Sequence, residues 1–133
     1  MKPMIQSAQQ RMRELGWGGT FEGSYIGQYL QGMAQHQKTA LAMMWGRING
    51  TLALAMLTPS SLVILQQPSQ GTGEAISFPL FHAISLKQKG EPVLITCLSD
   101  TWRLDDTDAS EVVAFQETLS EAMAPYRHLN RAV

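Results

Sequence analysis

The residues able to do chemistry are few and scattered along this chain of 133 residues. Its three histidines, His36, His82 and His128, lie far apart, and none has a ligand partner three or four residues away. Cys97 is the single cysteine, which excludes an internal disulfide and a cysteine-rich metal site. A nucleophilic cysteine needs an adjacent base and surroundings that favour the thiolate. We therefore interpret Cys97 as a buried structural residue and expect no metal, cofactor or catalytic site.

Acidic residues gather near the end of the chain, where a calcium loop is the first possibility to weigh. The group consists of Asp100, Asp105, Asp106, Asp108 and Glu111. It lacks the spaced oxygen ligands and central glycine of an EF-hand-like loop. Helix capping and solvation explain these carboxylates better.

Four basic or polar residues are the candidate ligand-binding set. Arg47 and Asn49 lie in a predicted hairpin turn, and Lys87 and Arg103 point outward from late strands together with Lys89. Such a patch attracts anions, although a solvated sheet face is the simpler interpretation. Basic residues interleaved with aromatic ones, which single-stranded nucleic acids require, are missing.

A glycine-rich segment, Gly16-Trp17-Gly18-Gly19, follows a predicted helix. A dinucleotide-binding loop follows a strand and has a different glycine spacing, so this function is excluded. Trp17 is then a candidate hook for a partner protein. The alternative is that it folds back onto an apolar surface of its own chain.

The bulk properties restrict the class of protein. Ten basic and 11 acidic residues give a net charge of −1, so no overall field draws nucleic acid or an anionic membrane. The first residues lack the apolar stretch of a signal peptide, and no segment reaches the roughly 18 apolar residues of a transmembrane helix. These features predict a single-domain cytoplasmic protein.

The order of apolar segments predicts an α+β, mainly β fold. Two helices, at 3–15 and 25–37, precede seven strands and a closing helix. The strands are expected at 39–45, 51–57, 61–66, 74–80, 83–89, 93–98 and 101–104. We expect residues 1–36 to form a helical extension packed on the sheet or on a partner, and residues 37–133 to form the main domain.

The closing helix has the clearest start signal, because Asp108 can cap its first turn and Glu111 can reach back to complete a capping box. Its apolar face consists of Val112, Phe115, Leu119, Ala122 and Met123. This helix is expected to plug a curved sheet.

Alternation along the first two strands leaves an apolar second face, opposite the face that carries Trp45 and Leu54. This second face consists of Ala40, Ala42, Met44, Ala53, Ala55 and Leu57. A strand that is apolar on both sides needs cover on both sides. The N-terminal helices or a second subunit could provide the cover. We therefore expect an interface made by Trp17, Ala42, Met44, Ala53, Ala55 and Leu57, with a protein partner or in a homo-oligomer.

The region from about Leu30 to Met123 resembles the bacterial PH-like (GRAM-like) domains. The resemblance rests on Gly50–Thr58 followed by Ser61–Leu65, on Phe78-Pro79-Leu80 leading to Ile84 and Leu86, and on Val93–Thr96 and Trp102-Arg103-Leu104 before the helix. It implies a seven-stranded bent barrel capped by a C-terminal helix. It also implies a non-enzymatic binding module for proteins, or alternatively a peripheral lipid or small-ligand binding domain.

Overall fold

A computed structural model describes residues 2–82, 84–88 and 92–127. Two helices come first, α1 (Lys2–Glu14) and α2 (Tyr25–Gln35). The strands that follow are β1 (Ala42–Ile48), β2 (Thr51–Leu57), β3 (Ser61–Gln67), β4 (Glu74–Pro79), β5 (Ile84–Gln88), β6 (Val93–Cys97) and β7 (Asp100–Leu104). Helix α3 (Ala109–Met123) and a 3₁₀ turn, η1 (Ala124–Tyr126), end the described chain. The α+β class is confirmed, although helix and strand are about equal in extent rather than mainly strand.

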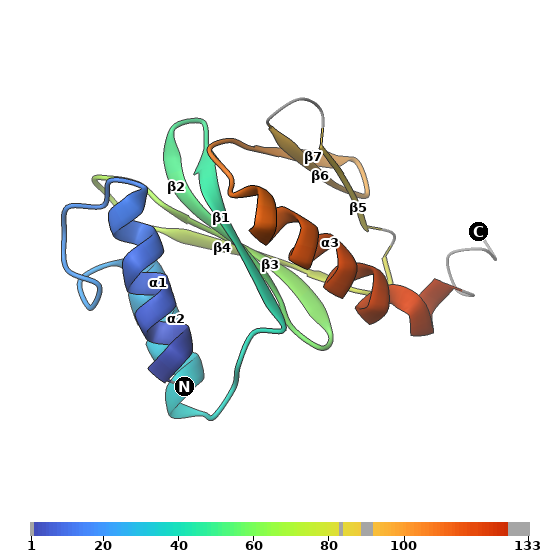
Figure 1. The fold of residues 1–133 in the computed structure, drawn as a ribbon, viewed down its shortest axis with the longest axis horizontal. Coiled ribbons are helices and arrows are strands. Elements are labelled where there is room, and N and C mark those ends of the chain that lie inside the picture. The colour runs from blue at the N-terminus through green and yellow to red at the C-terminus, as the bar shows by residue number, and fades with distance from the viewer. Residues whose placement is uncertain (1, 83, 89–91, 128–133) are drawn as a thin grey trace.

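The strands form two antiparallel sheets. One has the order β1-β2-β3-β4 and the other the order β5-β6-β7 (Figure 1). None of the described helices is long and apolar enough to cross a membrane.

The expected closed barrel is wrong. Among the described residues, β1 and β7 are joined by one isolated bridge between Arg47 and Asp105, and β4 and β5 pair only with β3 and β6. A barrel needs continuous pairing around its circumference. The result is two sheets that meet at one edge, with α3 lying along β1 beside that edge.

The first hairpin turns at Asn49-Gly50, as their sequence predicts. Asn49 has φ 52° and Gly50 has φ 77°, the left-handed pair that a two-residue turn requires. The first strand was expected at 39–45, but β1 runs from Ala42 to Ile48. Gly46, Arg47 and Ile48 therefore belong to the strand and not to the turn.

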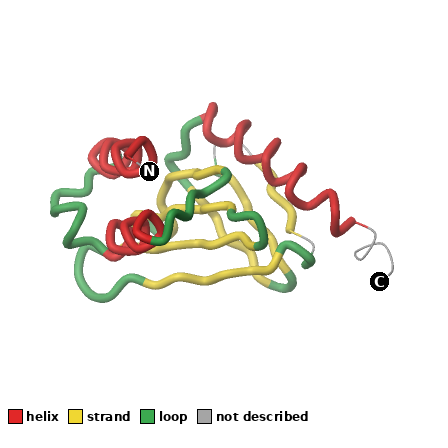
Figure 2. Tube along the Cα trace, turned by 90° about the horizontal axis from the view of Figure 1, so that it is seen from below, coloured by secondary structure: helices red, strands yellow, loops and turns green. Residues whose placement is uncertain are grey.

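Two separate cores lie on the two sides of the four-stranded sheet. Helices α1 and α2 cover one side, and α3 and the small sheet cover the other (Figure 1). In Figure 2 the two N-terminal helices are seen nearly end-on, while α3 runs lengthwise across the view. The core under α1 and α2 contains Trp45, Leu52, Leu54, Met56, Val63 and Leu65 from the sheet. The core under α3 contains Phe78, Leu80, Ile84, Ile95, Leu104 and Phe115.

Apart from Ala40, which packs against the core under α1 and α2, the predicted apolar second face is the inner face of the α3 core, so its predicted role as an interface is wrong for most of its residues. Met44, Ala53, Ala55 and Leu57 have at most 1% of their surface exposed, and Ala42 packs against the same core. Small side chains are needed here because the second sheet and α3 pack closely over them. The N-terminal helices cover the opposite face, which carries the larger Trp45 and Leu54.

Candidate functional site

The predicted ligand-binding arginine at the first hairpin is engaged in the fold. The guanidinium of Arg47 donates to Asp106 Oδ2 at 2.6 Å and to the carbonyl of Leu15, beyond the end of α1. These bonds tie the end of α1 to the edge of the sheet. The positive charge of Arg47 is therefore matched inside the molecule.

Lys87 and Arg103 do share the outer face of the small sheet, but they lie on its two edge strands. Each is in register with Leu94 of the central strand, which separates them. Arg103 also pairs with Asp105 at 3.0 Å. Lys89, expected in the same patch, lies outside the described residues.

Asn49 and Arg103 line one cavity of about 490 Å³ at the hairpin end of the molecule. Glu74 and Thr101 line it as well. A carboxylate in the lining, together with the pairing of Arg103, makes this cavity a poor receptor for an anionic headgroup.

Cys97 lies in the α3 core with no exposed surface. Burial first, and the charge of Asp100 second, raise the pKa of its thiol above the ordinary value. Both effects oppose formation of the thiolate, which is the reactive species. This environment fits a structural cysteine.

The remaining polar candidates are dispersed. His36 follows α2 as its C-cap residue, and the ring of His82 lies 4.6 Å from that of Phe81. His128 lies outside the described residues. Within the described chain no three histidine, cysteine or acidic side chains come together as a metal site.

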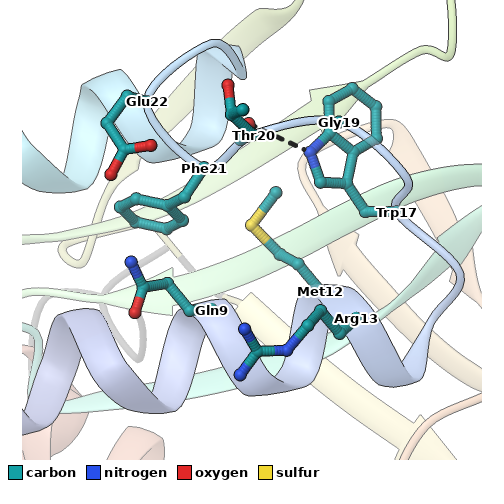
Figure 3. A pocket seen from close by; sticks show the side chains of 8 residues that line it. All are labelled: Gln9, Met12, Arg13, Trp17, Gly19, Thr20, Phe21 and Glu22. Atoms are coloured by element: carbon teal, nitrogen blue, oxygen red, sulfur yellow. Dashed lines mark hydrogen bonds between the residues drawn. The ribbon is translucent and has the colours of Figure 1, made fainter.

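Trp17 folds back on its own chain, which argues against the predicted hook. Its indole N–H donates to the carbonyl of Thr20 at 3.2 Å, and its ring is half-buried. Figure 3 shows Met12 between Trp17 and Phe21, and all three residues line a cavity of about 260 Å³. Trp17 therefore packs against the core under α1 and α2.

The clearest candidate site is a groove between β5 and α3, and sequence reasoning did not identify it. Among the described ladders β5 pairs only with β6, so its other edge presents backbone N–H and C=O groups that have no ladder partner. The groove beside this edge has a volume of about 330 Å³. Its lining consists of Ile84, Leu86, Gln116, Leu119, Ser120, Met123 and Arg127.

Two elements line the groove, and each of them places its lining side chains on one face. Ile84 and Leu86 alternate with outward-facing residues on β5, so both point toward α3. Gln116, Leu119, Ser120 and Met123 recur at steps of three and four residues and form one stripe of the helix. The lining therefore combines four apolar side chains with the polar side chains of Gln116, Ser120 and Arg127. At its end the guanidinium of Arg127 donates to the Ser120 hydroxyl at 2.9 Å and to its carbonyl at 3.2 Å.

This arrangement can bind an extended peptide but offers no catalytic group. A strand added to β5 would complete backbone hydrogen bonds, and an apolar side chain would enter the groove. Ser120, the one hydroxyl in the lining, contacts a guanidinium rather than a base. Two sequence signals for the site were the alternation that places Ile84 and Leu86 on one face of their strand and the apolar face of the closing helix, which continues to Met123.

Comparison with known proteins gives no further assignment, because no protein-family model, curated protein or solved structure matches this chain.

Proposed function

We propose that this protein is a non-enzymatic, PH-like binding module that takes up an extended segment of a partner protein along β5. The observation that carries the proposal is the unpaired edge of β5 beside a groove of about 330 Å³ that is lined in part by apolar side chains. Main-chain hydrogen bonds along such an edge supply affinity, and the groove selects the side chain that enters it.

The order of elements supports the PH-like interpretation. Four strands, three further strands and a closing helix follow one another, and that helix packs over the core between the sheets. The two sheets meet near the bridge between Arg47 and Asp105 and are splayed apart at β4 and β5. The splayed side is where the proposed peptide enters.

Charge supports a partner segment that carries an acidic residue close to its apolar anchor. Arg127 is the one charged residue in the groove lining, and Lys87 lies on the outer face of the same edge strand. If a second copy of this chain paired along β5, its own Arg127 and Lys87 would bring two more positive charges to the same edge. A heterologous segment with a carboxylate is therefore favoured over self-association through β5.

The alternative of peripheral lipid binding has weaker support. Arg47 and Arg103 are both paired with carboxylates, and Glu74 lines the cavity that holds Asn49. We further propose a cytoplasmic location, which a lone buried thiol at Cys97 supports.

The test is selection of binders from a displayed library of random 12-residue peptides, followed by titration of the enriched peptides. Ser120→Trp fills the groove and should weaken binding by about 30-fold, the effect of losing one hot spot. Ser85→Trp is the matched control, because Ser85 is exposed on the other face of the same strand. That variant should bind within about twofold of the original protein.

Light scattering on the same samples separates the two kinds of contact. A dimer that Ser120→Trp converts to a monomer would assign the groove to self-association instead of a partner segment. Failure to enrich any peptide, or enriched peptides that bind Ser120→Trp as tightly as the original protein, would overturn the proposal.

A further inference from the structure

A further cavity lies on the side of the four-stranded sheet that α1 and α2 cover, where helix α2 ends. It has a volume of about 590 Å³, within the range of small-ligand sites. Its walls come from α2, from the segment at 36–41 and from the hairpin between β2 and β3. It is separate from the β5–α3 groove and does not depend on the function proposed for that groove.

The sheet under this cavity is apolar. Met56 and Val63 lie at its floor with at most 3% of their surface exposed, while Tyr29 and Met33 of α2 line it from the other side. Leu41, at the rim, keeps 49% of its surface exposed. The cavity persists because α2 ends at Gln35 and the chain then turns away as a loop, which leaves this end of the sheet with partial cover.

Seven of the twelve residues in the lining carry polar side chains, and two of these side chains, Thr58 and Ser61, already satisfy each other. The hydroxyl of Thr58 accepts from the backbone N–H of Ser61 at 3.0 Å and lies 2.8 Å from the Ser61 hydroxyl. Lys38 is the one charged residue in the lining, and the ion pairs found among the described residues do not include it. The site therefore combines apolar contacts from Tyr29, Met33 and Leu41 with several hydroxyl groups and one positive charge near the surface.

We propose that this cavity binds an amphiphile with one aliphatic chain and one carboxylate. The chain lies against Tyr29, Met33 and Leu41, where it removes partly exposed apolar surface from water. The carboxylate lies near the ammonium group of Lys38, which sets the orientation of the ligand. A fatty-acid-like monoanion matches both the partly exposed apolar side chains and the single cation.

The methionines report which cavity a ligand enters. Met33 and Met56 line this cavity, Met123 lines the β5–α3 groove and Met12 lines the cavity beside Trp17. We suggest titrating protein that carries ¹³C-methyl methionine with octanoate, decanoate and dodecanoate, each below its micelle concentration. Shifts should be confined to Met33 and Met56. Affinity should rise about fourfold for each added methylene until the cavity is filled.

Two variants test the chemistry. Lys38→Gln changes an exposed side chain and should weaken decanoate binding by about threefold, while 1-decanol binding stays unchanged. Ser77→Trp adds bulk at the cavity wall from the exposed face of β4 and should abolish both sets of shifts. Ser120→Trp is its control and should retain them.

Shifts at Met123 or Met12 in place of Met33 and Met56 would overturn the proposal, as would the absence of shifts at millimolar decanoate. Equal weakening of decanoate and decanol by Lys38→Gln would remove the assigned role of the ammonium group.

Discussion

The guanidinium of Arg11 and the carboxylate of Glu111 form an ion pair between the first helix and the last one, with Nε and Oε2 2.7 Å apart. Glu111 Oε1 also accepts from the backbone N–H of Trp45 at 3.2 Å. One carboxylate therefore joins α1, β1 and α3. Arg11 in turn binds Glu14, and these bonds outweigh the opposing effect of burial, so that the pKa of Arg11 is raised.

We predict that Glu111→Ala lowers the free energy of unfolding by about 2 kcal/mol, because Arg11 and the Trp45 N–H lose a charged partner together. Urea denaturation followed by circular dichroism measures this change. A double-mutant cycle with Arg11→Ala should give a coupling energy of about 1 kcal/mol. Additive effects of the two substitutions would show that the pair contributes nothing.

The position of Ala55 tests which face of the hairpin is internal. Ala55→Leu should destabilise the protein by about 1–3 kcal/mol, since the added atoms must fit between the sheet and the α3 core. Val113→Leu on the exposed side of α3 is the control, with an expected change within about 0.5 kcal/mol. A neutral Ala55→Leu protein would mean that this face is open to solvent or to a partner.

Acid should weaken the start of α3. A hydrogen bond from the Ser110 hydroxyl and one from the backbone N–H of Glu111 lower the pKa of Asp108 below its ordinary value of 3.8. Because the pKa is lower in the folded protein, the stabilisation is complete well above pH 3.8 and is lost as the pH falls through the folded value.

Asp108→Asn keeps a capping oxygen but removes this titration. Its denaturation midpoint should therefore fall less between pH 6 and pH 2.5 than that of the original protein. Equal falls in the two proteins would assign the acid sensitivity to other carboxylates, of which Glu14, with a pKa lowered by Arg11, is the first to test.

The side chain of Gln67, at the end of β3, joins α2 to the sheet through hydrogen bonds. Its side-chain oxygen accepts from the backbone N–H groups of Tyr25 and Ile26, and its amide nitrogen donates to the Pro68 carbonyl at 3.1 Å. Gln67→Ala should cost about 1–3 kcal/mol, since donors in the first turn of α2 lose their acceptor. Hydrogen exchange should accelerate first in α2. Unchanged exchange there, alongside a stable protein, would contradict this role.

Local rules predicted several elements correctly. Asn49-Gly50 demands a tight turn whatever surrounds it, and the Asp108 side chain does accept from the N–H of Glu111. The second half of the predicted capping box is different: the Glu111 carboxylate binds Arg11 and the Trp45 N–H. Because glycine has a low helix propensity, Gly27 predicts a weak point in α2. In the structure, however, a Cβ at this position would lie 1.8 Å from the Phe21 carbonyl oxygen. Its lack of a side chain permits that close approach.

For the groove between β5 and α3, local patterns likewise predict which side chains share a face but not which elements lie close together. Alternation indicates that Ile84 and Leu86 share a face, and helical periodicity indicates that Leu119 and Met123 do. Neither pattern determines the distance between β5 and α3. In the structure this distance leaves a groove between the two elements instead of a filled core.

The amino-acid sequence by itself determined the order of helices and strands, the first hairpin, the start of α3 and which side chains share a face, because these follow from interactions within a few residues. Only the tertiary structure decided that Ala55 faces α3 while Leu54 faces the N-terminal helices, that the sheets stay open, and that Glu111 binds Arg11. Those outcomes depend on how segments far apart in the chain fill space against one another, and periodicity along one segment carries no information about the element that will cover it.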